Sequence, residues 1–161
     1  MMDSLPPSET VSTIERLRDF IGVVVRVSHW HTITQDEVDR FAALTGEDGW
    51  IHVDPERAAH SHFGGTIAQG NLLLSMAPSL LRQGEGLTID LEVRYGLNYG
   101  LNRVRYPSSV LVNSPIRAQL TLLEIEDVAP DVYQLVWERM IEVEGSSKPA
   151  MVAESLSRQF T

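Results

Sequence analysis

The chain has 161 residues, which suits one domain with a substantial core, and its 43% hydrophobic and 22% charged residues are ordinary for a globular protein. The formal net charge of −9 argues against a nucleic-acid binder, because no cluster of Lys and Arg is present to neutralise a phosphate backbone. The absence of cysteine excludes a disulfide framework, a thiolate nucleophile and a thiolate metal site, and it fits a reducing compartment such as the cytoplasm.

The N-terminal residues differ from the rest of the chain. Residues 1–9 are rich in Pro and Ser, so we predict a flexible N-terminus followed by a single domain over residues 10–161. This N-terminus has no apolar core of the kind found in a secretory signal. The longest apolar run, near Leu72–Leu81, is too short to span a bilayer, and we therefore expect no membrane partner.

The first third of the domain is predicted to be mainly helical. An apolar stripe predicts a helix over Thr10–Phe20, and β-branched and aromatic residues predict a strand over Val23–Ile33. Thr34 then has the character of an N-cap, with Glu37 three residues later completing a capping box. The helix that follows is expected to end at Gly46.

A second helical region contains the most apolar stretch of the chain. Asp54-Pro55 is a helix start, because the Asp side chain caps and the missing proline N–H costs nothing there. A helix over Asn71–Leu81 is apolar on nearly all sides and is expected to be buried. Pro78 lies within it, and predicts either a kink or a boundary between two helical pieces.

From Leu87 onward the hydrophobic pattern changes to a period near two, which is typical of strands. A slip in the alternation at Leu122-Leu123 suggests a β-bulge. The order of elements predicts an α+β domain, in which a curved antiparallel sheet is wrapped around the central apolar helix. The predicted strands are Leu87–Tyr95, Asn102–Tyr106, Ile116–Asp127, Val132–Val143 and Met151–Phe160.

The run from Phe41 to Gly70, FAALTGEDGWIHVDPERA…FGGTIAQG, resembles the hydratase signature of MaoC-like proteins, the (R)-specific enoyl-CoA hydratases. The segments Trp50–Ala58 and Asn98–Arg105 are most similar to the nodulation protein N branch, and the likeness extends from about Leu17 to Phe160. It implies a hotdog fold, dimeric or built as a double hotdog. It also implies hydration of a trans-2-enoyl-CoA to a (3R)-hydroxyacyl-CoA, without metal or organic cofactor.

This chain departs from the family pattern at four positions. Glu47 stands where the family usually has Asp, and Gly49 where it usually has Asn or Gln. The motif before the central helix is usually I-A-H-G, and here Gln69 replaces the histidine. A serine that some members place within the central helix falls at Pro78.

Hydration of an unsaturated thioester needs a base for the attacking water, an acid for the α-carbon, and donors for the charge that gathers on the thioester oxygen. Glu47 and His52 are five residues apart in one loop, and both have usable protonation states near neutrality. We predict that this pair binds and activates the water. The N–H of Gly70, at the start of the central helix, is the predicted oxyanion donor, and its lack of a side chain lets the thioester approach closely.

The residues around this site are predicted to bind or shape the substrate. Asp48 is an alternative acid, one residue off the family register. Gln69 and Asn71 flank Gly70 and are predicted to bind substrate, although Gln69 also fits a hydrogen-bonded structural role. Arg103 and Arg105 are predicted to meet the phosphates of a coenzyme A tail, with a solvated strand as the plain alternative.

Two histidine pairs, His29 with His31 and His60 with His62, suggest a metal at first sight. No carboxylate is placed to complete either set, so we expect no metal and no other cofactor.

Three functions are compatible with the sequence. The first is the hydratase, acting on an acyl-CoA or acyl carrier protein thioester. The second is a hotdog thioesterase, which the position of His52 after the loop acid disfavours. The third is a non-catalytic acyl-thioester binder, which the changes at Glu47 and Gly49 keep open. A single hotdog would leave a sheet edge exposed, so a homodimer is expected.

Overall fold

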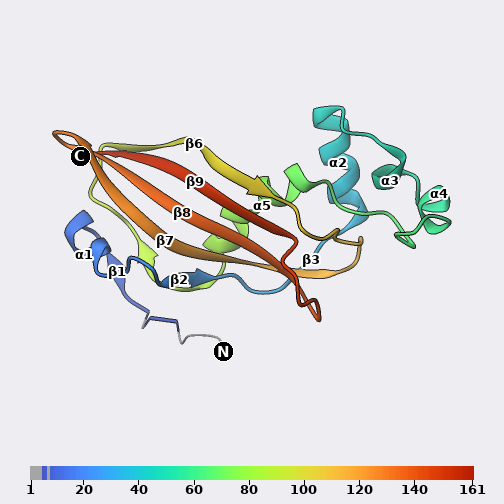
Figure 1. Cartoon of the computed structure of the whole chain (residues 1–161), viewed down its shortest axis with the longest axis horizontal. Helices are drawn as coiled ribbons and strands as arrows, with labels where there is room; N and C mark the ends of the chain where they lie inside the picture. Colours follow the sequence, from blue (N-terminus) through green and yellow to red (C-terminus); the bar gives the residue numbers. More distant parts are fainter. Residues whose placement is uncertain (1–4, 7) are drawn as a thin grey trace.

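A curved antiparallel sheet dominates the computed structural model, which describes residues 5–6 and 8–161 (Figure 1). Its strands follow the order β4-β2-β7-β8-β9-β6, with β3 beside β7. The short strands β1 (Thr10–Val11) and β5 (Thr88–Ile89) form a separate parallel pair. The strands of the large sheet are β2 (Val24–Val27), β3 (His31–Thr32), β4 (Glu85–Gly86), β6 (Tyr95–Arg105), β7 (Pro115–Ala129), β8 (Val132–Val143) and β9 (Met151–Phe160).

One helix, α5 (Gly70–Arg82), packs against this sheet. Its buried residues join apolar side chains of β7, β8 and β9 in the larger of two core clusters. The helix continues through Pro78, so the predicted boundary between two helical pieces is wrong. Antiparallel sheet and central helix confirm the predicted α+β hotdog architecture. Among the described residues, no helix has the length and apolar character needed to cross a membrane. The buried residues of α5 are Leu72, Leu73, Ala77, Leu80 and Leu81.

Three helices gather beyond one end of the sheet, beside the N-terminus of α5 (Figure 1). They are α2 (Gln35–Thr45), α3 (Trp50–Val53) and α4 (Pro55–Ala59). A fourth short helix, α1 (Ile14–Arg18), lies near the opposite end. The Asp54 side chain accepts the N–H of Arg57, which confirms the predicted helix start at Asp54-Pro55.

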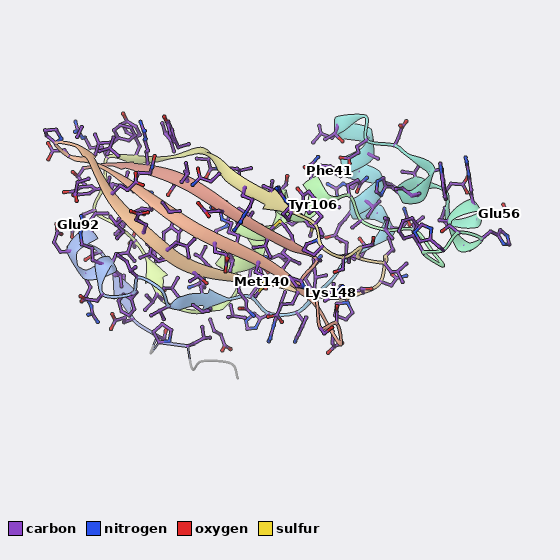
Figure 2. All side chains as sticks on the ribbon, in the orientation of Figure 1. Phe41, Glu56, Glu92, Tyr106, Met140 and Lys148 are labelled. Carbon is purple, nitrogen blue, oxygen red and sulfur yellow. The ribbon has the colours of Figure 1, made fainter. Side chains whose placement is uncertain are left out.

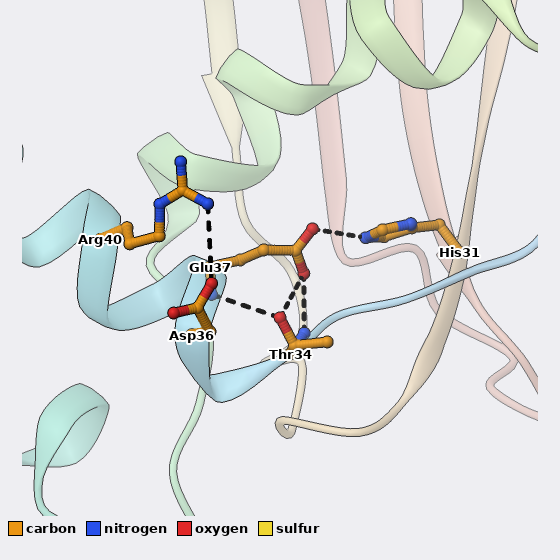
Figure 3. A network of polar contacts seen from close by, with 5 residues as sticks. All are labelled: His31, Thr34, Asp36, Glu37 and Arg40. Atoms are coloured by element: carbon orange, nitrogen blue, oxygen red, sulfur yellow. Dashed lines mark hydrogen bonds and ion pairs between the residues drawn. The ribbon is translucent and has the colours of Figure 1, made fainter.

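The N-terminus of α2 is fixed by the predicted capping box (Figure 3). The Thr34 hydroxyl accepts the N–H of Glu37 at 3.2 Å, and the Glu37 carboxylate accepts the N–H of Thr34 at 2.8 Å. The other carboxylate oxygen of Glu37 lies 2.8 Å from Nε2 of His31. Burial alone raises the pKa of Glu37, but hydrogen bonds from Thr34 and the contact with His31 outweigh it, so that the pKa is lowered.

Other predictions differ in their bounds. The strand predicted over Val23–Ile33 is divided into β2 and β3, because the Ser28 hydroxyl accepts the N–H of Ala118 where a backbone carbonyl would continue the ladder. The strand predicted over Leu87–Tyr95 is divided into β5 and the first residue of β6, Tyr95, because N–H groups in the middle of this segment donate to carbonyls of residues 9–12, outside the large sheet. The helix predicted over Thr10–Phe20 loses its first residues to the same pairing, and α1 begins after the Thr13 cap.

Later predictions agree closely with the structure. Strand β9 has the predicted bounds, and the register shifts between Leu122 and Glu124 as the expected bulge requires. The prediction of a flexible segment over residues 1–9 falls partly on residues 1–4 and 7, which lie outside the described part. The carbonyl of Glu9 accepts the N–H of Thr88, so backbone pairing begins by that residue.

Strand β6 forms one edge of the sheet and is exposed along nearly its whole length. It pairs with β9 on one side. Val104 is partly buried, and the other residues of β6 are exposed. Large apolar side chains are among the exposed ones, with Tyr95 52% and Tyr99 55% exposed. A long, exposed and apolar edge is a surface that proteins normally cover.

Candidate active site

The loop between α2 and α3 carries the predicted acid. Gly46 ends α2 in the left-handed conformation, with φ of 77°, and turns the chain toward Glu47. The carbonyl of Glu47 accepts a hydrogen bond from Nε2 of Gln69 at 3.2 Å. The same amide nitrogen donates to the carbonyl of Val38 in α2, also at 3.2 Å. Gln69 therefore joins the acid loop, α2 and the start of α5.

His52 lies on α3, with only 8% of its surface exposed. Its Nδ1 is 2.7 Å from the carbonyl oxygen of Ile67. Because a carbonyl oxygen only accepts, Nδ1 must carry the proton in this contact, and Nε2 of a neutral ring then holds the lone pair. The backbone of α3 is fixed as well, since the Gln35 amide donates to the carbonyl of His52 at 2.8 Å. This arrangement prepares Nε2 to act as a base.

A cavity of about 160 Å³ lies between His52 and the first residue of α5, Gly70. The N–H of Gly70 is in the first turn of the helix, where no intrahelical acceptor exists. The cavity also touches the ring of Tyr106, which directly follows β6. A Cβ atom on Gly70 would lie 2.9 Å from that ring, so a side chain at position 70 would collide with Tyr106. The structure thus brings the predicted base and the predicted oxyanion donor to one cavity.

Tyr106 connects this cavity to Glu47. Burial raises the pKa of the Tyr106 phenol, and the negative charge of Glu47 raises it further. The phenol donates to Oδ1 of Asn71 at 3.2 Å, and Figure 2 shows Tyr106 near the start of α5. Sequence reasoning placed Tyr106 only at a strand end, because nothing in the local pattern signals that this end faces Gly70.

The remaining predicted site residues lie around this centre. Asn71 is exposed and bonded to Tyr106, whereas Gln69 is completely buried and contacts the protein backbone. Asp48 is exposed beside Glu47. Arg103 and Arg105 are exposed on β6, which ends one residue before Tyr106.

The histidine pairs have separate surroundings. His31 contacts Glu37, and the ring of His62 lies against Phe63. Within the described residues, no three His, Cys, Asp or Glu side chains are grouped in a way that would hold a metal ion.

His52 and the N-terminus of α5 share one cavity of a hotdog fold, and Glu47 is not among the described residues that line it. Comparison with known proteins identifies the class of protein as a MaoC-like dehydratase. The chain belongs to the MaoC-like dehydratase family, since the family model of the MaoC like domain matches residues 17–142. The resemblance seen in the sequence is therefore confirmed.

Two relatives are similar over most of their length. The chain is 46% identical over 149 residues to 3-hydroxyacyl-thioester dehydratase Z of Mycobacterium tuberculosis (strain ATCC 25618 / H37Rv), covering 92% of this chain and 97% of the relative. It is 39% identical over 134 residues to Nodulation protein N of Rhizobium leguminosarum bv. viciae, covering 83% of this chain and 82% of the relative. The similarity to the nodulation protein N branch is likewise confirmed.

Solved structures share the fold. An (R)-hydratase from A. caviae involved in PHA biosynthesis matches with a TM-score of 0.66 and 22% identity, covering 83% of this chain and 94% of that chain. The C-terminally truncated HadBC (3R-hydroxyacyl-ACP dehydratase) complex from Mycobacterium tuberculosis matches with a TM-score of 0.70 and 14% identity, covering 87% and 97%. At these identities the likeness establishes the hotdog fold and nothing finer.

Proposed function

We propose that this protein catalyses the reversible hydration of a trans-2-enoyl thioester to a (3R)-hydroxyacyl thioester, with Glu47, His52 and Gly70 in the catalytic roles. Family membership makes the chain a hydratase/dehydratase of the lyase class. The observation that carries the residue assignment is the hydrogen bond from Nδ1 of His52 to the Ile67 carbonyl. It leaves Nε2 as the acceptor of an imidazole that lines the same cavity as Gly70.

The proposed steps balance with these groups alone. The water oxygen adds to the β-carbon while one water proton passes to Nε2 of His52, and Glu47 orients the water by accepting its other O–H. Electron density moves to the thioester oxygen, to which the N–H of Gly70 donates with the help of the helix dipole. The imidazolium then returns its proton to the α-carbon. Dehydration follows the same steps in reverse.

We assign Gln69 a positioning role rather than a direct contact with substrate. Its amide holds the carbonyl of Glu47, and its complete burial keeps it away from solvent. The loop has glycine at position 49, so it lacks a polar side chain there to support the acid. Gln69 supplies that support from the start of α5. Asn71, which is exposed, stays the proposed substrate contact.

The thioester carrier is proposed to bind along the end of β6. Arg103 and Arg105 are exposed there, close in sequence to the cavity residue Tyr106. Two cations on an acidic protein give a local site for the phosphates of coenzyme A or of an acyl carrier protein.

A homodimer is the proposed working form. The exposed apolar edge of β6 supports it, because a second copy would cover the unpaired backbone groups and the exposed tyrosines. A symmetric interface of this kind is the commonest in soluble oligomers. The cysteine-free sequence is consistent with the proposed cytoplasmic location.

One observation favours a second candidate, a non-catalytic acyl-thioester binder. The Tyr106 ring covers the face of Gly70, and within the described residues no hydrogen bond joins the side chains of Glu47 and His52. A thioester can be held in such a site without being hydrated if the pair never converges on one water.

A spectrophotometric assay with crotonyl-CoA and a longer enoyl-CoA tests the proposal. We expect loss of enoyl absorbance without release of free thiol, and we expect Glu47→Gln and His52→Ala each to lower kcat by about 10²–10⁴-fold. Matched controls are Glu56→Gln and His60→Ala, two exposed residues at α4, which should leave the rate unchanged. Free thiol would identify a thioesterase, and tight binding without turnover would identify the non-catalytic binder.

A further inference from the structure

A second and larger cavity lies at the other end of α5. It has a volume of about 660 Å³, which is in the range of small-molecule sites. Residues near the C-terminus of α5, including Pro78 and Leu81, form one wall, and the inner faces of β8, β9 and β6 form another. None of the residues that line this cavity also lines the cavity beside His52. The two cavities therefore lie beside different ends of α5.

The charges around this cavity have one sign. Three arginines line it, Arg26, Arg82 and Arg139, and no acidic residue is among its described lining residues. The protein as a whole has a formal net charge of −9. A purely cationic lining in an acidic protein marks a local site for an anion.

Arg26 and Arg82 are less suited than Arg139 to bind an anion in this cavity. The Arg26 guanidinium donates to the backbone carbonyls of Leu81, Arg82 and Gly84 and to that of Leu87, so it caps the C-terminus of α5. The side chain of Arg82 is exposed. Neither cation is buried without a partner.

Arg139 differs from both. It stands on β8 between Trp137 and Ile141, on the face that the period of a strand directs toward the core. Its Nε atom is buried and has no hydrogen-bond partner among the described residues. Burial also lowers the pKa of Arg139, with no nearby carboxylate to oppose this effect. Arg139 as a whole is partly buried, and a cation with a buried N–H that lacks a partner is costly unless it contacts an anion.

The rest of the lining combines apolar and polar surface. Trp137 and Leu87 offer apolar contact, and Trp137 is fixed by a 3.1 Å hydrogen bond from its Nε1 to the Ser157 hydroxyl. Asn98 and Gln159 add amide groups that can donate to an anion. The lining suits a ligand with an apolar body and one anionic end.

We propose that this cavity binds a carboxylate carried on an apolar body, with the partly buried Arg139 as the counter-ion. Two sources share this chemistry. One is the far end of an acyl substrate whose chain terminates in a carboxylate, and this source rests on the proposed hydratase function. The helix rise of 1.5 Å per residue places Pro78 about 12 Å from Gly70 along α5, a distance that a medium-length acyl chain spans. The other source is a free long-chain carboxylic acid.

Calorimetry on the full-length wild-type protein tests the site directly, with decanoate as the probe and decanamide as its uncharged match. We expect decanoate to bind and decanamide to bind at least about tenfold more weakly, since hydrogen bonds to charged groups are the stronger ones. Arg139→Met should weaken decanoate binding by at least about tenfold, and Arg139→Lys, which keeps the charge, should weaken it less. Arg158→Met is the matched control, because Arg158 does not line the cavity, and it should bind decanoate like the wild type.

A kinetic arm separates the two sources. If the substrate carries the carboxylate, Arg139→Met should raise KM about tenfold for trans-2-decenedioyl-CoA and leave KM for trans-2-decenoyl-CoA unchanged. If the ligand is a free acid, decanoate binds as expected and the two substrates respond equally to the substitution. Failure of all enoyl thioesters to react would overturn the proposed hydratase, and the calorimetry would still decide the carboxylate site.

Three results would overturn the proposal. They are no heat of decanoate binding to the wild type at millimolar concentration, equal binding of decanoate and decanamide, and equal decanoate binding by wild type and Arg139→Met. A fourth is dissociation of a wild-type dimer by Arg139→Met in sedimentation measurements. That result would show that the anion facing Arg139 belongs to a second copy of this chain.

Discussion

The two ends of α5 differ in the kind of buried polar atom that lacks a partner. At the N-terminal end the His52 ring, the Glu47 carbonyl and the α2 cap each have a partner within the protein. Among the described residues, Oε1 of Gln69 at the N-terminal end and Nε of Arg139 at the C-terminal end are both buried without a partner, but only the arginine carries a charge. Catalysis requires groups that are oriented before the substrate binds. A site that recognises an anion instead has a cation without a partner until its ligand binds. In our two proposals, this contrast corresponds to reaction at one end of the helix and recognition at the other.

Beyond the substitutions of Glu47 and His52, the largest effect is expected from Gly70→Ala, which should lower kcat by about 10²-fold, because the new methyl group displaces the Tyr106 ring and intrudes where the thioester must lie. Steady-state kinetics of the hydration reaction measure it. In the double variant with Tyr106→Ala, the collision with the ring is absent. If the double variant is as slow as Gly70→Ala alone, then the methyl group acts on the substrate directly. A Gly70→Ala enzyme as fast as the wild type would remove Gly70 from the site.

A smaller effect, about tenfold in kcat, is expected for Gln69→Leu. The leucine keeps the volume of the buried side chain but cannot donate to the carbonyls of Glu47 and Val38, so the acid loop loses its support. KM should change little, because Gln69 is buried and does not touch the substrate in our proposal. Kinetics measure both constants. A rise in KM with an unchanged kcat would instead favour the substrate-binding role first predicted for Gln69.

The sequence predicted the reaction end of the helix better than the recognition end, for physical reasons. The capping box of Thr34 and Glu37 and the helix end at Gly46 depend on neighbours close in the chain, and such neighbours are visible in a sequence. The Arg139 site depends on what β6, β9 and α5 leave beside it. In the sequence, Arg139 is visible as one charged residue within the apolar alternation of β8. Only the tertiary structure shows that no acidic residue lines the cavity beside it.

Tyr106 illustrates the same limit at the reaction end. Its ring meets Gly70, which lies far from it in the chain, and its phenol interacts with Glu47 at a still greater separation. Strand periodicity predicts where a residue points relative to its own strand, and it carries no information about which helix terminus the strand end will meet. The bounds of the short strands failed for a related reason, since residues 9–12 competed with the large sheet for pairing.

For Arg139→Met we expect a stability change of the opposite sign to most core substitutions. The methionine side chain fills similar space without the buried, unpartnered Nε–H of Arg139, so the free energy of unfolding should rise by about 1 kcal/mol in the absence of ligand. Urea denaturation measures it, with Arg158→Met as the control for loss of an arginine. A clear loss of stability would mean that Arg139 serves the fold, and the contrast between the two ends would fail.

The smallest effect tests whether the reaction end depends on pH through its cap. Glu37→Gln should lower the free energy of unfolding by about 0.5 kcal/mol at neutral pH, because the charged hydrogen bonds to Thr34 and His31 weaken. The pKa of Glu37 is lower in the folded protein than its ordinary value of 4.5. Its contribution is therefore fully present above pH 4.5 and lost as the pH falls through the lower folded-state value. Urea denaturation across this range measures the free energy of unfolding of wild type and Glu37→Gln, and the difference between them should become smaller as the pH falls. A difference that does not change with pH would show that the charge of Glu37 does not support α2.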